Sequence, residues 1–289
     1  MPRFGAHLSI AGGVDQAVTR AREIRAETLQ LFVKSPSQWR FAPLADEEVL
    51  RFRADARDAG LAPLVGHASY LVNLASPDPA LWERSCRCVL GEWDRGQRLG
   101  LDYLVLHPGA HMGNGEAAGL AQIARALERL RRERPDHTVK ILLETTAGAG
   151  TVLCGRIEHL EQLIAGCDPR GEGWLGVCVD TCHLWAAGYD LRTRQAIDDL
   201  LGRLDEAVGL ARVAVVHAND ARGGLGSHLD RHAHIGRGRL GRETFRLLVH
   251  HPALAALPFI LETPKEDARG RKMDPVNLRT LRRLARQVE

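Results

Sequence analysis

The feature of this sequence that most constrains its fold is a set of eight short apolar segments, which alternate with segments of helical length. The apolar segments are hydrophobic almost throughout, as expected for strands buried on both faces in a parallel sheet. They span residues 4–9, 28–33, 62–67, 103–107, 139–144, 175–180, 213–217 and 258–262. The segments with helical spacing span residues 13–25, 46–59, 79–99, 116–134, 156–165, 195–209, 242–250 and 275–287.

Regular alternation of strand and helix favours right-handed crossover units and an α/β fold. Eight such units in 289 residues fit a closed (β/α)₈ TIM barrel, with a doubly wound open sheet as the alternative, because sequence alone does not reveal closure. No Ser/Gly/Pro-rich linker divides the chain, so we expect one domain over residues 1–289. Residues 220–239 are rich in glycine and histidine and predict a long functional loop.

Composition excludes several other classes of protein. With 45% hydrophobic and 26% charged residues, the chain is expected to be globular and not disordered. It has no apolar run near the roughly 20 residues of a membrane span, and residues 1–5 contain no apolar signal segment, so a cytoplasmic protein is expected. The six cysteines form no C-x-x-C pair, which argues against a thiolate zinc site. A net charge of +3 is too small to indicate nucleic-acid binding by itself.

Residues able to bind a metal stand where the predicted strands end. Five strands end in such a residue, and a sixth ends in an aspartate followed by a histidine: His67, His107, Glu144, His217 and Glu262, then Asp180 with His183. In a barrel these ends converge on one face. One histidine there is more often a hydrogen-bonded core residue, but six coinciding ends predict a metal site, because buried histidines and carboxylates are costly without partners.

The types of ligand limit which metals the site could bind. Asp230 and His232 of the long loop bring the set to five histidines and four carboxylates. Imidazole and carboxylate without thiolate indicate zinc or manganese at a catalytic site. At about three protein ligands per open site, nine ligands serve about three metals, or two if some only orient others. Clustered metals suit phosphate ester hydrolysis.

Three further features have weaker implications. Residues 236–241 match G-x-G-x-x-G, but no predicted strand precedes them, so no nucleotide cofactor is expected, although a phosphate contact stays open. Lys34 ends the second strand, where a Schiff-base lysine could stand, but a surface ion pair or a phosphate contact is favoured. Tyr70 and Leu71 follow His67 and are either loop packing or, on duplex DNA, a wedge between bases.

Several motifs together resemble the endonuclease IV family of apurinic/apyrimidinic (AP) endonucleases, in family order from about residue 4 to about residue 265. They are Gly5-Ala6-His7-Leu8-Ser9, Ala11-Gly12-Gly13, His107-Pro108-Gly109-Ala110-His111, Glu144-Thr145-Thr146-Ala147-Gly148, Asp180-Thr181-Cys182-His183, Ala186-Ala187-Gly188-Tyr189-Asp190, His217-Ala218-Asn219-Asp220, Asp230-Arg231-His232 and Leu261-Glu262-Thr263.

The resemblance implies three zinc ions, with manganese as a partial substitute. The first ion would be held by His67 and His107, the second by Asp180, His217 and Glu262, and the third by His183, Asp230 and His232, with the catalytic Glu144 bridging the first two. In the family, a hydroxide between the first two metals attacks the phosphorus 5′ to an abasic sugar, and the third stabilises the departing 3′ oxygen. The products are a 3′-hydroxyl and a 5′-deoxyribose phosphate, and blocked 3′ ends are also trimmed.

The resemblance further implies duplex DNA containing abasic sites as the partner of a monomeric enzyme. Tyr70 and Leu71 match wedge residues, and Gln38 is expected to contact DNA. Ser37 departs from the family, which can carry an arginine there. The alternatives are a metal-dependent sugar isomerase or epimerase, a DNA-damage binding protein that does not cut, and a β-elimination enzyme acting through Lys34.

Overall fold

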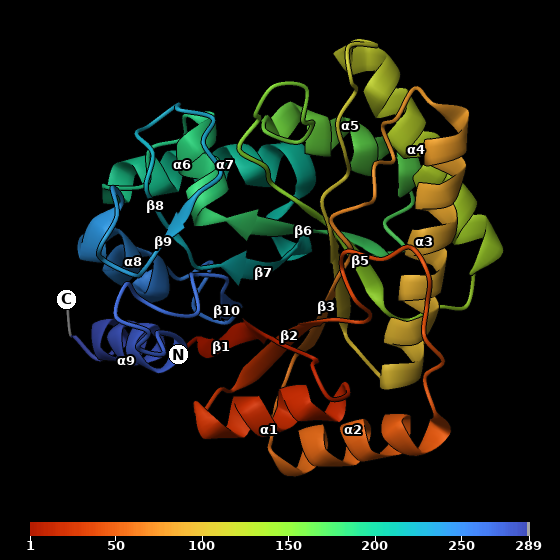
Figure 1. Cartoon of the computed structure of the whole chain (residues 1–289). Coiled ribbons are helices and arrows are strands. Elements are labelled where there is room, and N and C mark those ends of the chain that lie inside the picture. The colour runs from red at the N-terminus through yellow and green to blue at the C-terminus, as the bar shows by residue number, and fades with distance from the viewer. Residues whose placement is uncertain (288–289) are drawn as a thin grey trace.

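Eight parallel strands close into a barrel in the computed structural model, which describes residues 1–287 (Figure 1). Their order is β1-β10-β7-β6-β5-β4-β3-β2, so β1 pairs with both β2 and β10 and closes the sheet. The prediction of a (β/α)₈ barrel is therefore confirmed, and the open sheet is excluded. The barrel strands are β1 (Arg3–Leu8), β2 (Thr28–Phe32), β3 (Leu64–His67), β4 (Tyr103–Leu106), β5 (Lys140–Glu144), β6 (Leu175–Asp180), β7 (Val213–His217) and β10 (Pro258–Leu261).

Helices surround the barrel, and all eight predicted helices are present with ends within two residues of the expected positions. They are α1 (Asp15–Glu23), α2 (Asp46–Asp58), α3 (Pro79–Leu99), α4 (Glu116–Glu133), α5 (Ile157–Cys167), α7 (Arg194–Val208), α8 (Gly241–His250) and α9 (Asp274–Ala285). Among the described residues, none of these helices is long and apolar enough to cross a bilayer.

Local sequence explains where the longest helix begins and ends. The Asp78 side chain accepts a hydrogen bond from the Ala80 backbone N–H at 2.9 Å, and Pro79 occupies the first helical position of α3. The helix ends at Gly100, whose φ of 70° suits a residue without Cβ. In between, Trp93 is fully buried and donates its indole N–H to the Val139 carbonyl at 2.8 Å.

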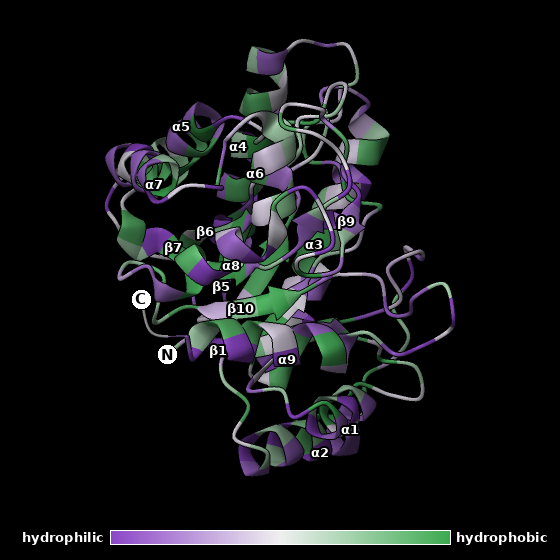
Figure 2. Cartoon of the chain, turned by 90° about the vertical axis from the view of Figure 1, so that its left-hand side faces the viewer, coloured by the Kyte–Doolittle hydropathy of each residue, from purple (hydrophilic) through white to green (hydrophobic). Residues whose placement is uncertain are grey.

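The core has two parts because side chains along a strand alternate in direction. Outward-facing side chains pack against the helices in a large cluster, and Figure 2 shows the helices with hydrophilic (purple) and hydrophobic (green) bands along them. Inward-facing side chains form a smaller cluster inside the barrel, made of Val65, Val105, Leu142, Cys178, Val215 and Ile260. This apolar layer fills the barrel below the site.

Four short elements were not predicted: α6 (Thr181–Ala187), the 3₁₀ turn η1 (Leu210–Arg212), β8 (Asp220–Ala221) and β9 (His232–Ala233). The strands β8 and β9 pair antiparallel within the segment 220–239. That segment was expected to be a loop throughout, so the expectation is corrected: residues 220–221 and 232–233 form a ribbon that fixes the loop between them.

Candidate metal centre

A polar layer lies directly above the apolar layer inside the barrel. Each of the six interior residues is followed, two positions later in the sequence, by a predicted metal ligand at or just beyond the end of its strand: His67, His107, Glu144, Asp180, His217 and Glu262. Because side chains at positions i and i+2 of a strand point the same way, these six residues face the barrel axis one layer nearer the carboxyl ends. The strand pattern by itself therefore brings them together.

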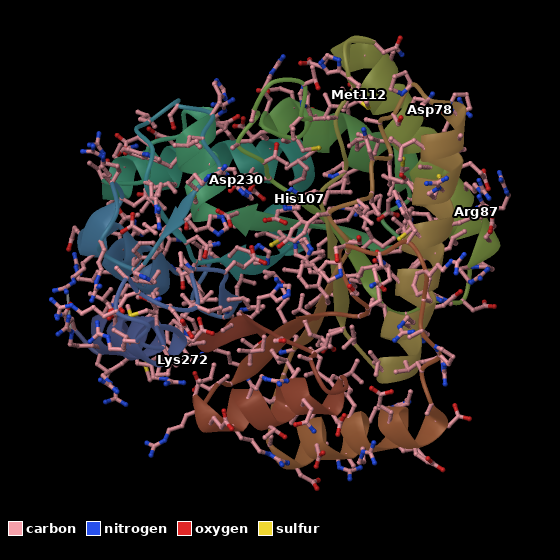
Figure 3. All side chains as sticks on the ribbon, in the orientation of Figure 1. Asp78, Arg87, His107, Met112, Asp230 and Lys272 are labelled. Carbon is pink, nitrogen blue, oxygen red and sulfur yellow. The ribbon has the colours of Figure 1, made fainter. Side chains whose placement is uncertain are left out.

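Two of the other three predicted ligands lie in unpredicted elements, and the third lies in the loop before β9. Asp180 caps α6 by accepting a hydrogen bond from the His183 backbone N–H at 2.9 Å, which places His183 in the first helical turn beside the strand ends. His232 lies in β9, and Asp230 precedes it in the loop. Figure 3 shows Asp230 and His107 near one another at this end of the barrel.

The nine residues fall into three overlapping ligand groups, in each of which the ligand atoms lie within 4.8 Å of one another. The groups are His67–His107–Glu144, Glu144–Asp180–His217–Glu262 and His183–Asp230–His232. A fourth group is Asp180–Cys182–His232. Burial raises the pKa of the Cys182 thiol to about 12, so this sulfur is protonated at neutral pH when no metal is bound.

Glu144 joins the first two groups through its two oxygens. Its Oε2 lies 2.9 Å from the His107 Nε2 and 3.3 Å from the His67 Nε2, whereas its Oε1 lies 2.9 Å from the His217 Nδ1. Complete burial pushes the pKa of Glu144 upward, but His107 and His217 outweigh it and hold that pKa well below the usual range. The carboxylate is therefore ionised and faces imidazoles on both sides.

Backbone carbonyls orient three of the histidines. The Nδ1 atoms of His67, His183 and His232 lie 2.7, 2.8 and 3.2 Å from the carbonyl oxygens of Ala68, Thr145 and Glu262. A carbonyl can only accept a hydrogen bond, so each Nδ1 carries a proton, and Nε2 is the ring nitrogen that a metal would take by displacing a proton. This is the arrangement expected of histidines that bind a metal.

The acidic groups around these histidines favour a positive charge in the site. Burial opposes charge on His183, yet Asp180, Asp230 and Glu144 raise the pKa of His183 well above its usual value. The buried Nε2 of His232 has no hydrogen-bond partner among residues 1–287 and lies 3.5 Å from the Asp230 Oδ1 and 3.7 Å from the Asp180 Oδ2. A buried ring nitrogen left without a partner between two carboxylates has the position of a metal ligand.

The site opens into a hollow of about 520 Å³. His107 and Asp230 are its most accessible predicted ligands, with side-chain exposures of 31% and 49%. Two arginines, Arg222 and Arg231, also line it. The hollow therefore combines acidic and imidazole groups with guanidinium groups suited to a phosphate.

The three residues expected to contact DNA lie on loops, and one of them lines this hollow. Tyr70 is 69% exposed and lines the hollow, and its ring centroid lies 5.2 Å from that of Phe32. Leu71 is half-buried and Gln38 is exposed. The side chain of Tyr70 is therefore accessible to a ligand in the hollow.

Lys34 does not occupy the surface position favoured from the sequence. It is buried, and its Nζ lies 3.2 Å from the Glu92 Oε1 and 2.6 Å from the Gln38 carbonyl oxygen. The same Glu92 carboxylate accepts a hydrogen bond from the Ser69 backbone N–H. The expectation of a surface ion pair or a phosphate contact was wrong: Lys34 ties the loop at 35–38 to the loop that carries Tyr70.

The glycine-rich segment 236–241 surrounds a carboxylate of the protein itself. Asp220 is fully buried and accepts hydrogen bonds from the backbone N–H groups of Gly238 at 2.9 Å, Leu240 at 2.9 Å and Gly241 at 3.3 Å. A Cβ at Gly238 would lie 2.4 Å from the Asp220 Oδ1, so only glycine fits there. These donors are already engaged, which argues against a phosphate contact through them.

Sequence reasoning missed three buried polar residues at the site. His7 and Gln30 complete the polar layer from β1 and β2, and Asn219 follows β7. The Asn219 amide donates to the Asp180 Oδ2 at 2.6 Å and accepts from the Glu262 backbone N–H at 2.8 Å. The available signal was a polar residue inside, or just beyond, a mostly apolar strand.

A curated protein of known family is similar to almost the whole of this chain. A probable endonuclease 4 of Chloroflexus aggregans is 47% identical over 286 residues, which cover 99% of both chains. The chain belongs to the endonuclease 4 family. A model of the Xylose isomerase-like TIM barrel family also matches residues 18–285.

Solved structures agree with this assignment. The crystal structure of endonuclease IV from Thermus thermophilus is 39% identical, covers 98% of each chain and superposes with a TM-score of 0.85. A D-tagatose 3-epimerase-like protein is 18% identical with a TM-score of 0.73, over 97% of this chain and 96% of the other. At that identity the second likeness shows a shared barrel fold alone.

Proposed function

We propose that this chain is a zinc-dependent AP endonuclease of DNA repair, which hydrolyses the phosphodiester 5′ to abasic sites in duplex DNA. The observation that carries the proposal is the convergence of nine histidine and carboxylate side chains around Glu144 beneath one open hollow. The high identity to probable endonuclease 4 sequences supports it. The products would be a 3′-hydroxyl and a 5′-deoxyribose phosphate, and blocked 3′ ends would be trimmed by the same chemistry.

The nine residues have separate tasks in this proposal. Glu144 would be shared between the first and second zinc ions, because its two oxygens face the two groups. His67 and His107 would complete the first site, and Asp180, His217 and Glu262 the second. His183, Asp230 and His232 would hold the third. When bound, the ions would supply a nucleophile at neutral pH and neutralise charge on the departing oxygen.

Other residues would bind and position the DNA. Arg222 and Arg231 line the hollow and suit bidentate contacts to phosphate oxygens, which contribute affinity without reading sequence. An abasic nucleotide has no base pair to lose, so its extrusion costs less than flipping a paired base. The exposed ring of Tyr70 beside the hollow is placed to stack on a neighbouring base.

The decisive experiment uses a duplex that contains a tetrahydrofuran mimic of the abasic site. The mimic has no aldehyde, so a β-elimination enzyme cannot cut it, and a binding protein or a sugar epimerase would leave it whole. We expect cutting on the 5′ side with a 3′-hydroxyl product, loss of cutting after chelation, and recovery with zinc. A duplex that stays intact with zinc-replete protein would contradict the proposal.

A matched pair of variants assigns the cutting to this site. Glu144→Gln keeps the size of the side chain and removes its charge, so cutting should be abolished. Glu158→Gln makes the same change at a side chain of α5 that is 46% exposed, and it should cut at the normal rate. Normal cutting by Glu144→Gln would show that the activity lies elsewhere.

A further inference from the structure

Gln30 is a buried carboxamide in the polar layer of the barrel. It lies in β2, is fully buried and contacts three polar side chains. Its Nε2 lies 2.6 Å from the Glu262 Oε1 and 2.9 Å from the His7 Nδ1. Its Oε1 lies 2.8 Å from the His217 Nε2. The amide therefore connects two of the residues that we assign to the second metal.

The orientation of this amide follows from its partners. The ionised Glu262 carboxylate can only accept hydrogen bonds, so the NH₂ group of Gln30 must face it. The Gln30 oxygen then faces His217, and an amide oxygen can only accept. The His217 Nε2 is therefore the ring nitrogen that carries a proton.

This proton fixes which nitrogen of His217 remains for a metal. With Nε2 protonated, the lone pair of the neutral ring lies on Nδ1, which is 2.9 Å from the Glu144 Oε1 and 3.3 Å from the Glu262 Oε2. His67, His183 and His232 obtain the opposite tautomer from backbone carbonyls. Among these four histidines, His217 is the one whose tautomer is fixed by a side chain. A mutation of Gln30 can therefore remove this hydrogen-bond partner without changing the backbone.

We propose that Gln30 is a positioning residue of the second metal site, which sets the tautomer of His217 and holds Glu262 in place. It would touch neither the metal nor the DNA and would act through those two ligands. Residues that orient metal ligands in this way typically contribute a factor of about 10 to 100 in metal affinity. This role rests on the proposed metal centre.

The first test is Gln30→Met, which keeps the length of the side chain and removes both hydrogen-bonding functions. Zinc affinity is measured on the full chain without DNA, by competition with a chelator. We expect two ions to bind as in the wild-type protein and one to bind about 10 to 100 times more weakly. Wild-type affinity for all ions in Gln30→Met would overturn the proposal.

Thr28→Val is the matched control for this variant. Thr28 precedes Gln30 by two residues in β2, so it faces the same way, and it is also fully buried. Its hydroxyl donates to the Pro63 carbonyl at 2.6 Å and touches no predicted ligand. Thr28→Val also removes a buried hydrogen bond, but it should keep wild-type zinc affinity. Equal weakening in both variants would overturn the proposal in favour of a general loss of packing.

A spectroscopic test separates orientation from stability. The nitrogen chemical shifts of the His217 ring in zinc-loaded protein should report a proton on Nε2. Thr28→Val leaves the Gln30 oxygen facing His217, so it should preserve this signature, whereas Gln30→Met should lose it. A signature unchanged in Gln30→Met would overturn the proposal, as would its loss in Thr28→Val. Because these measurements use no DNA, failure to cut abasic DNA would count against the proposed function alone.

Discussion

Replacing Lys34 by methionine tests the buried ion pair beneath the Tyr70 loop. Lys34 and Glu92 have side-chain exposures of 3% and 1%, and methionine keeps most of the aliphatic chain while removing the charge. Removing one partner of such a pair leaves an uncompensated buried charge and costs about 3 to 5 kcal/mol. For a chain of this length, that loss lowers the melting temperature by on the order of 10 °C.

The pH dependence of this loss has a definite sign. Burial raises the pKa of Glu92 above its usual value, with Lys34 acting in the opposite direction. Without Lys34 that pKa rises further, so the folded variant is favoured at low pH and loses stability as pH rises through the new value. The nearby Cys88 does not titrate in this range, because burial raises the pKa of its thiol to about 12. The difference in stability between variant and wild type should therefore be larger at pH 8 than at pH 5.

Thermal unfolding followed by circular dichroism at pH 5 and pH 8 measures both effects. The double variant Lys34→Met/Glu92→Gln removes both charges and should recover more than half of the lost stability. A loss below about 1 kcal/mol in Lys34→Met at pH 8, or an equal loss at both pH values, would refute the reasoning. Below its melting temperature, Lys34→Met should still cut tetrahydrofuran duplexes, since this lysine is not the nucleophile.

Three further substitutions test other parts of the site. Glu144→Gln should lower the zinc content of the purified protein as well as abolish cutting, whereas Glu158→Gln should leave the zinc content unchanged. Tyr70→Ala should raise KM for abasic duplex about tenfold with little change in kcat, because a stacked base contributes about 1 to 3 kcal/mol; an unchanged KM would remove Tyr70 from the DNA interface. Gly238→Ala places a Cβ 2.4 Å from the Asp220 Oδ1, so it should weaken binding of the third zinc in chelator competition more than that of the other two; equal weakening of all three would contradict a local role for the ribbon.

The strand pattern was the most informative part of the sequence. It predicted every barrel strand and the eight helices that surround the barrel, and it identified six ligand positions, because the carboxyl ends of the strands converge on one face of a barrel. Asp230 and His232 were found from their place in a long loop. The ribbon that fixes that loop was missed, because paired strands of two residues leave no detectable periodicity.

Other features depend on contacts between distant residues. Gln30 interrupts an apolar strand and looks like an isolated exception until β2 is placed beside His217, 187 residues away. Lys34 and Glu92 lie on different elements with no local pattern to join them, so the lysine was expected at the surface. The segment 236–241 carries a phosphate-binding spacing, but its donors are taken by Asp220, whose position only the fold reveals.

The most direct test of the metal centre is an anomalous diffraction map recorded at the zinc absorption edge, from crystals of protein purified without chelators. We predict three peaks: one between His67 and His107, one near His217 and Glu262, and one between His183 and His232. A map with no peak at the barrel mouth, or with a single ion there, would contradict the account.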